Sequence, residues 1–276
     1  MNKQRVLFIG GGNMTQAIVS GLVANGHSPK VLTVVDRNSE KRALLSTQFH
    51  INVTDQLTLN LFDADIIVLS TKPQSAKEVC LQLRPFLKGK KPLILSVMAG
   101  LTINLLNSWL GEMFPIVRAM PNTPALVRAG ATGLFAAPSV TQAQKLQIES
   151  LVSSMGIIAW LEQETQIDII TALSGSGPAY FFLMIEAMQM TATQLGLPEK
   201  IAKQFAIQTA YGASVLALNS DESVSTLRAQ VTSKGGTTEA AINVFQQEGF
   251  SKIVEAAMHA AKNRSEALGR ERDELT

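Results

Sequence analysis

The chain has 276 residues, which is enough for about two domains and at least one sizeable core. Its composition, 46% hydrophobic and 17% charged, is typical of a globular protein and excludes a long disordered segment. The formal charge of +2 arises from basic residues scattered along the chain, so the charge does not indicate nucleic-acid binding. Cys80 is the single cysteine, which excludes an intrachain disulfide and suits a reducing compartment. We expect it to be a small buried hydrophobic residue.

The same features predict a cytoplasmic protein that does not enter a membrane. The first apolar run ends at Gly10, which is too short for the core of a signal peptide. The most apolar later run, residues 179–190, contains Glu186 and is shorter than the roughly 20 residues of a membrane span. The three histidines, at positions 27, 50 and 259, lie outside every motif and are expected at the surface, and no metal site is predicted.

The first part of the chain alternates predicted strands and helices. Residues 5–9 form a continuous apolar run, as expected for a strand that is buried on both faces of a parallel sheet. Repeated β-α-β units with short loops predict a doubly wound sheet of the Rossmann type over residues 1–161. The predicted strands are 5–9, 31–35, 65–69, 92–97, 116–119 and 132–136, and the predicted helices are 14–25, 40–49, 75–83 and 142–155.

A helical period dominates after residue 161, so residues 162–276 are predicted to form an all-α domain. Two of its helices, residues 178–195 and 198–219, carry apolar residues around most of their circumference and must be buried on most sides. We expect them to lie in a subunit interface, and the alternative is a core helix pair within one subunit. The predicted helices are 165–173, 178–195, 198–219, 223–231, 237–248 and 250–267.

A glycine turn predicts a dinucleotide site. Gly10, Gly11 and Gly12 follow the first strand and, with Asn13 and Met14, open the first helix. The first glycine permits a tight turn, and the third lets backbone amides approach a pyrophosphate at the helix N-terminus. Thr15 stands where the G-x-G-x-x-G/A pattern has a third small residue, which weakens the match.

The end of the second strand leaves the cofactor open. Asp36 suits the ribose hydroxyls of NAD, whereas Arg37 suits the 2′-phosphate of NADP because a guanidinium is planar and bidentate. We favour NADP, with NAD as the alternative. The sequence motifs of kinases, zinc hydrolases and serine hydrolases are absent from the chain.

Four further segments are polar or glycine-rich at positions where ligands bind. One ends a strand with Lys72, and a second places Asn122 between two prolines. The fourth segment, residues 232–238, leads into a helix and offers several backbone amides and hydroxyls, a suitable site for a carboxylate. Taken singly, each is equally well explained as a loop with capping residues. The segments are 69–73, 120–124, 174–178 and 232–238.

These segments, in this order and spacing, give the chain its resemblance to the pyrroline-5-carboxylate reductases. The residues concerned are 8–14, 72–73, 118–125, 174–180 and 233–238. The resemblance implies a Rossmann domain and a helical domain that interlocks two subunits, with a dimer or a pentamer of dimers as the assembly. Three positions depart from the family pattern: Lys234 replaces a proline, Thr15 replaces Ala or Gly, and Val224 replaces a common proline.

The resemblance also implies the reaction, in which 1-pyrroline-5-carboxylate is reduced to proline by hydride transfer from NADPH or NADH. Orientation of the ring against the nicotinamide then carries much of the catalysis. Thr238 would hydrogen-bond the ring nitrogen, and Glu164 matches an acidic position near the substrate, although an acid in the first turn of a helix explains it nearly as well. The substrate-binding residues would be Glu164, Ser233, Gly235, Gly236, Thr237 and Thr238. The further cofactor-binding residues would be Ser70, Thr71, Lys72, Pro73, Val97, Met98, Ala99 and Asn122.

Two other functions remain open from the residues alone. One is a different Rossmann oxidoreductase that acts on an imine or a hydroxyacid. Such enzymes usually need a catalytic lysine or a dedicated acid-base residue in the helical domain, and no lysine there lies in a recognisable motif. The other is a dinucleotide-binding dimer without catalysis, which would bind NADPH without consuming it.

Overall fold

A computed structural model describes residues 4–273 of the chain. These residues form two compact units. One comprises the described parts of Met1–Ser176 and Ala261–Thr276, and the other is Gly177–Ala260. Residues 162–176 belong to the sheet unit by their contacts. The functional boundary after residue 161 stays a prediction.

Every predicted strand and helix is present, with ends shifted by a few residues, and the structure adds two strands and one α-helix that the sequence did not predict, at residues 52–54, 156–160 and 103–110. The strands are β1 Val6–Ile9, β2 Leu32–Val35, β3 Asn52–Thr54, β4 Ile66–Leu69, β5 Leu93–Ser96, β6 Ile116–Met120, β7 Gly130–Ala136 and β8 Gly156–Trp160. The α-helices are α1 Asn13–Ala24, α2 Ser39–Phe49, α3 Ala76–Leu87, α4 Ile103–Leu110, α5 Gln142–Val152, α6 Gln166–Ile170, α7 Gly177–Gln194, α8 Glu199–Leu218, α9 Val224–Gln230, α10 Thr237–Gln247 and α11 Phe250–Asp273. A π-helical turn, η6 Thr171–Gly175, separates α6 from α7.

The eight strands form one sheet in the order β3-β2-β1-β4-β5-β6-β7-β8. The first six in this order are parallel, β7 runs antiparallel to β6, and β8 is parallel to β7. The order reverses at β1, whose neighbours are β2 and β4, and ligands bind above such a switch point at the carboxyl ends of the strands. The predicted doubly wound fold is confirmed.

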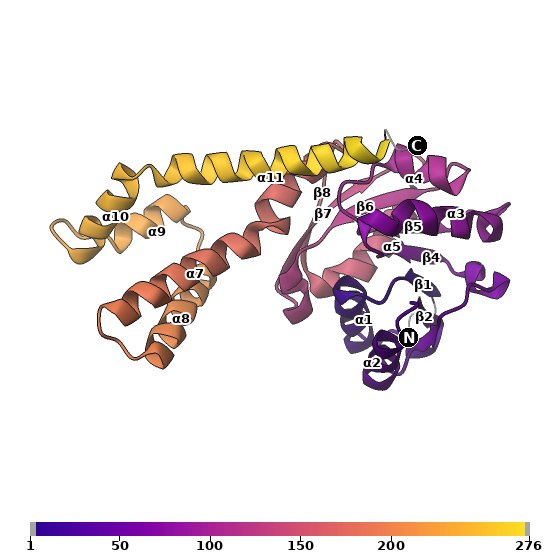
Figure 1. The fold of residues 1–276 in the computed structure, drawn as a ribbon, viewed down its shortest axis with the longest axis horizontal. Helices are drawn as coiled ribbons and strands as arrows, with labels where there is room; N and C mark the ends of the chain where they lie inside the picture. The colour runs from indigo at the N-terminus through magenta and orange to yellow at the C-terminus, as the bar shows by residue number, and fades with distance from the viewer. Residues whose placement is uncertain (1–3, 274–276) are drawn as a thin grey trace. The chain divides into compact units, whose positions relative to one another are not determined.

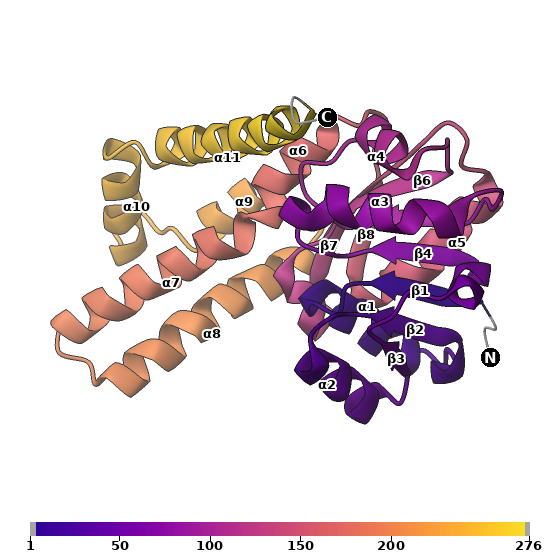
Figure 2. The same ribbon diagram turned by 45° about the vertical axis from the view of Figure 1, so that its right-hand side comes forward.

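Helices cover both faces of this sheet. On one face α1 packs against α2 and α5, and on the other α3 packs against α4 (Figure 1, Figure 2). Strands β1, β4 and β5 are buried along their whole length, as their uninterrupted apolar runs require. The core of the unit therefore lies on both sides of the central strands.

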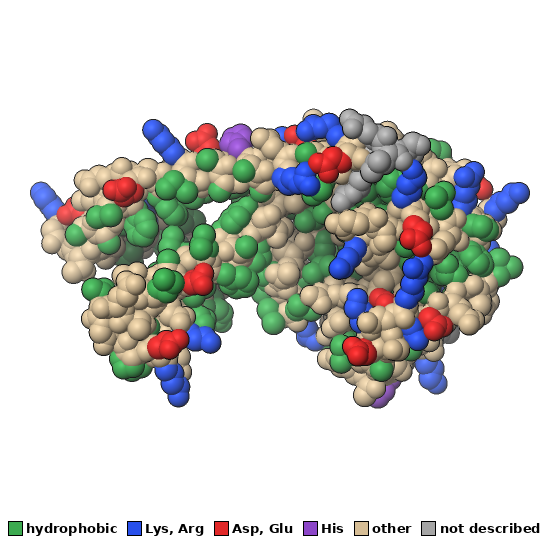
Figure 3. Space-filling view, in the orientation of Figure 1, with side chains coloured by type: hydrophobic (Ala, Val, Ile, Leu, Met, Phe, Trp, Pro, Cys, Tyr) green, Lys and Arg blue, Asp and Glu red, His purple; other side chains and the backbone are tan. Residues whose placement is uncertain are grey.

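In the second unit α7 packs against α8, and the small residues Ala202 and Ala206 are buried in α8. Their large apolar neighbours remain exposed within the chain, including Phe181, Phe182 and Phe205 at 64%, 65% and 68%. Hydrophobic side chains are visible on this part of the surface in Figure 3. The alternative of a core helix pair within one subunit is therefore wrong.

Two other expectations need correction. The apolar run 179–190 lies inside a helical stretch, Gln166–Gln194, that is 29 residues long with a mean hydropathy of 1.3, so the stretch is long and apolar enough to cross a membrane. Length therefore does not exclude a span at this segment. His27 is buried, not at the surface, and its Nε2 lies 2.9 Å from the carbonyl oxygen of Gln4.

Candidate active site

A cavity of about 680 Å³ opens at the carboxyl edge of the sheet, above the switch point at β1. Its walls come from the loop after β1, the end of β2, the loop after β4 and one face of α3. A volume of this size suits a small-molecule or cofactor site. The lining residues are Ile9, Gly10, Gly12, Asn13, Met14, Val35, Asp36, Arg37, Lys41, Asp55, Leu57, Ser70, Thr71, Lys72, Pro73, Ser75, Glu78, Val79, Gln82, Leu83 and Val97.

The glycine turn forms the floor of this cavity. Gly10 has φ +104°, and a side chain there would meet the carbonyl oxygen of Ser70 at 2.7 Å, so both conformation and space require glycine. Thr15 is fully buried, and its hydroxyl donates to the Gly10 carbonyl at 2.6 Å and lies 2.6 Å from the Ser70 hydroxyl. The third motif position thus ties α1 to the turn and to the end of β4.

Helix α1 points its N-terminus at the cavity. Gly12 is its N-cap, and a side chain built there would meet nothing within 4 Å. Because glycine offers no capping oxygen, the first amides of the helix are left to an anion, which the helix dipole also favours. The glycine turn and the first amides of α1 therefore fit the pyrophosphate of a dinucleotide.

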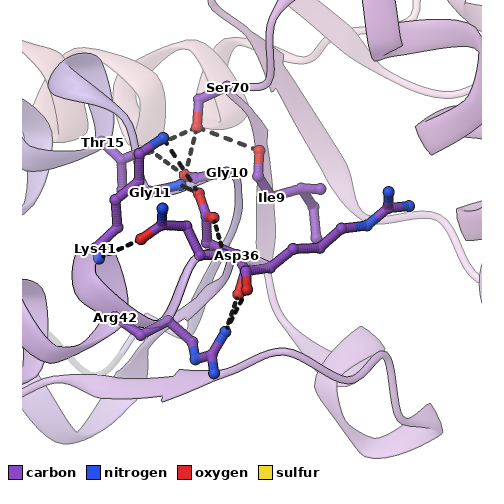
Figure 4. Close-up of polar contacts among 10 residues, drawn as sticks. Ile9, Gly10, Gly11, Thr15, Asp36, Lys41, Arg42 and Ser70 are labelled. Atoms are coloured by element: carbon purple, nitrogen blue, oxygen red, sulfur yellow. Dashed lines mark hydrogen bonds and ion pairs between the residues drawn. The ribbon is translucent and has the colours of Figure 1, made fainter.

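The carboxylate of Asp36 is bonded to the backbone. Its Oδ2 accepts from the Gly11 amide at 2.7 Å and its Oδ1 accepts from the Asn38 amide at 2.8 Å (Figure 4). Lys41 lies 3.9 Å from the same carboxylate. Arg42 donates to the Asp36 carbonyl at 2.6 Å. The acid at the end of β2 thus holds the glycine turn in place.

Arg37 extends across the cavity to α3. Its guanidinium donates to Glu78 at 2.9 Å and, at a longer 3.4 Å, to Gln82. The hydrogen bond and the charge of Arg37 hold the pKa of the Glu78 carboxyl below its usual value. Glu78 and Gln82 are one helical turn apart, and Gln82 donates to Glu78 at 3.0 Å.

The predicted substrate loop lies in the second unit, before α10. Gly235 has φ +74°, and its amide donates to the Glu239 carboxylate at 2.7 Å. The Gly236 amide donates to the Ser233 carbonyl at 3.0 Å, and Gly236 is the N-cap of α10. This turn leaves the amides of Thr237 and Thr238 in the first turn of a helix, where a carboxylate is favoured.

Glu164 lies in the first unit and has two partners. It accepts from the Ile103 amide at the start of α4 and from the Arg118 guanidinium, both at 2.8 Å. The side chain of Arg118 is 4% exposed and that of Glu164 is 27% exposed. The pair joins the middle of β6 to the N-terminus of α4.

The comparisons with known proteins agree over the whole chain. Residues 5–100 match the family described as NADP oxidoreductase coenzyme F420-dependent, and residues 164–268 match the family described as pyrroline-5-carboxylate reductase dimerisation. The chain is 46% identical to the pyrroline-5-carboxylate reductase of Pseudomonas aeruginosa over 268 residues, which are 97% of this chain and 98% of that protein. The chain belongs to the pyrroline-5-carboxylate reductases. These are NAD(P)H-dependent oxidoreductases that reduce 1-pyrroline-5-carboxylate to proline.

Solved structures of other pyrroline-5-carboxylate reductases share the fold. The enzyme of Coxiella burnetii has a TM-score of 0.90 at 44% identity and covers 97% of this chain and 99% of its own. The enzyme of Plasmodium falciparum, solved with NADP bound, has a TM-score of 0.85 at 30% identity and covers 98% of this chain and 99% of its own. The match to a dimerisation domain shows that this reductase associates with copies of itself.

Most of the predicted cofactor residues of this reductase share the cavity. Gly11, Met98, Ala99 and Asn122 are outside its lining. The lining residues that the sequence did not predict are Ile9, Val35, Lys41, Asp55, Leu57, Ser75, Glu78, Val79, Gln82 and Leu83. The spacing of the last four in a predicted helix, at i, i+1, i+4 and i+5, marks one face and was a usable signal.

Asn122 and Met98 have partners inside the fold. The Asn122 side chain accepts from the Ala131 amide at 2.9 Å and donates to the Ser174 carbonyl at 3.0 Å. Met98 is buried, and its sulfur accepts from the Thr71 hydroxyl at 3.4 Å. Asn122 therefore joins the loop after β6 to the π-helical turn η6.

Proposed function

We propose that this reductase uses NADPH in preference to NADH, bound in the cavity at the carboxyl edge of the sheet. The observation that carries the proposal is that each carboxylate oxygen of Asp36 already accepts a hydrogen bond from a backbone amide. An acid that selects NADH must instead accept hydrogen bonds from the ribose hydroxyls. Arg37 and Lys41 line the same end of the cavity and offer cations to a 2′-phosphate. The solved relative with NADP bound supports this assignment.

The proposed contacts follow the walls of the cavity. The pyrophosphate lies at the N-terminus of α1, on the amides between Gly10 and Met14. The loop Ser70–Pro73, with Lys72, and the segment Val97–Ala99 then flank the nicotinamide, and Asn122 braces the neighbouring loop. When bound, NADPH supplies the hydride that reduces the imine carbon.

We propose that the turn before α10 binds the substrate. The substrate carboxylate accepts from the amides and hydroxyls of Ser233–Thr237, at the positive end of the helix. The protonated ring nitrogen donates its hydrogen to the Thr238 hydroxyl, which steadies the electrophilic form until reduction leaves a neutral amine. Glu164 keeps Arg118 and the N-terminus of α4 in place, because both of these groups already occupy its carboxylate.

The oligomer proposed here is a dimer that pairs the apolar faces of α7 and α8, alone or as a pentamer of dimers. The exposed phenylalanines on these helices support the pairing, because contiguous exposed apolar residues mark interfaces. The same pairing accounts for the apolar stretch Gln166–Gln194 without a membrane. Light scattering on the purified protein distinguishes two copies from ten.

We also propose that the enzyme works in the cytoplasm. Its only cysteine is buried and reduced, as expected for a protein from a reducing compartment. Fractionation of cells that express the tagged chain tests this, and recovery in the membrane fraction would contradict it.

The first experiment measures oxidation of NADPH and of NADH in parallel on addition of 1-pyrroline-5-carboxylate. We expect proline as the product and a higher kcat/KM with NADPH. Binding of NADPH without its consumption would instead indicate a binding protein without catalysis. Equal or better use of NADH would overturn the cofactor assignment alone.

The second experiment replaces Thr238 with alanine. Loss of a hydrogen bond to a charged group lowers kcat by about 10-fold to 100-fold, while the Kd for NADPH stays nearly unchanged. Thr238→Ser keeps the hydroxyl and should recover most of the turnover. Full activity in Thr238→Ala would remove the ring-nitrogen role.

A further inference from the structure

The Glu78 carboxylate on α3 forms an ion pair with the Arg37 guanidinium, just after the end of β2. Arg37 Nη2 and Glu78 Oε1 are 2.9 Å apart, with side chains that are 75% and 60% exposed. Gln82, on the next turn of α3, contacts both of them. The contact therefore crosses the cavity from the end of β2 to α3. With the pyrophosphate at the N-terminus of α1, the adenosine end of a dinucleotide would lie at this place.

The other acids at this end of the cavity have different partners. Asp36 accepts two backbone hydrogen bonds and lies near Lys41. Asp55 lies 3.1 Å from the Arg42 guanidinium. Glu78 is therefore the acid, among the described lining residues, whose ionic partner is Arg37. A 2′-phosphate would have to share Arg37 with this carboxylate, and the two anions repel each other.

We propose that Glu78 is a specificity-determining residue of the cofactor site, which weakens NADPH binding relative to NADH by holding Arg37. NADH has no phosphate at the 2′ position, so neither the competition for Arg37 nor the repulsion acts on it. This inference rests on the proposed binding of NADP in the cavity, with Arg37 at the 2′-phosphate. Glu78 thus keeps the preference for NADPH below the value that Arg37 alone would give.

The test is Glu78→Gln, which keeps the shape and the acceptor oxygen and removes the charge. The Kd values for NADPH and NADH are measured by nucleotide fluorescence without the second substrate. We expect the Kd for NADPH to fall about 3-fold to 5-fold, as for an exposed ion pair, and the Kd for NADH to change less than about 2-fold. The gain should shrink when the salt rises from about 50 mM to about 500 mM, because exposed charges are screened.

Two controls isolate the contact. Glu112→Gln removes the same charge from another exposed ion pair, with Lys91, outside the cavity lining, and should leave both Kd values unchanged. In an Arg37→Ala background, Glu78→Gln should give less than half of its gain in NADPH affinity. An unchanged or weaker Kd for NADPH in Glu78→Gln, an equal gain for NADH, or a full gain without Arg37 would each overturn the inference.

The binding measurement separates this inference from the proposed function. Failure of the wild-type enzyme to turn over 1-pyrroline-5-carboxylate, or a preference for NADH, would overturn the proposed function. The effect of Glu78 is read from the change in the ratio of the two Kd values, which is measured in either case.

Discussion

Cys80 shows how burial sets the chemistry of a single residue. It lies in α3 among core residues, and desolvation raises the pKa of its thiol from 9.0 to about 12. The thiolate is the reactive form of cysteine, so the folded protein holds almost none of it at pH 8. We expect Ellman's reagent to label the native enzyme at least about 100-fold more slowly than the enzyme in urea. Labelling at similar rates would contradict burial of this thiol.

The same pKa predicts how stability changes with pH. The unfolded chain releases the thiol proton near pH 9 and the folded chain only near pH 12, so the unfolded state binds fewer protons between these values. The contribution of Cys80 to the free energy of unfolding is thus complete below pH 9 and falls as pH rises above it. Urea unfolding of Cys80→Ala between pH 8 and pH 10 should show a weaker fall than the wild type.

Single residues were predicted by type more accurately than by partner. The sequence identifies Asp36 at the end of a strand, but whether its carboxylate meets a ribose or the backbone depends on the approach of Gly11, which is 25 residues away. Thr15 weakens a motif when read alone, because its bonds to Gly10 and Ser70 exist only once β4 lies beside β1. Residue types carry local chemistry, whereas partners require the tertiary fold.

At the scale of elements, long buried strands and periodic helices were predictable, and short or half-exposed elements were not. Strand β3 has three residues and begins with the exposed Asn52, so it lacks an apolar run. Strand β8 alternates half-buried and exposed positions at the edge of the sheet. Helix α4 has eight residues, about two turns, which gives a weak periodic signal.

Asn122 permits a test of how two of these elements are joined. In Asn122→Asp the carboxylate still accepts from Ala131, but it cannot donate to Ser174 and faces that carbonyl with a negative charge. We expect the free energy of unfolding to fall by about 1–2 kcal/mol, the lower part of the cost of an unsatisfied polar group, because Asn122 is partly buried. Chemical denaturation measures this loss, and hydrogen exchange should rise in residues 171–175.

Asn52→Asp is a matched control. The Asn52 amide also donates to a backbone carbonyl, that of Lys30 at 2.8 Å, but its residue is exposed and water can replace the bond. Its loss of stability should be clearly smaller. Equal losses in the two variants would show that the link between the loop after β6 and η6 adds nothing beyond an ordinary surface hydrogen bond.

For the whole molecule, the sequence indicated an interface because two helices carry more apolar surface than one chain can cover. This inference needs only composition and period, whereas the partner surface depends on how two copies meet. The division of the chain into a sheet unit and a helical unit reflects the same pattern. The sheet unit buries its apolar residues internally, and α7 and α8 leave theirs exposed.

Phe182 on α7 tests the interface directly. It is 65% exposed within the chain, and burial of such a side chain contributes about 1.5–3 kcal/mol to association. A symmetric dimer contains the residue twice, so Phe182→Glu should weaken self-association by at least about 100-fold. Analytical ultracentrifugation at micromolar concentration should then detect monomers. Gln147→Glu, which adds the same charge on the exposed surface of α5, should keep the wild-type mass. A Phe182→Glu protein that keeps the wild-type mass would place the interface on another surface.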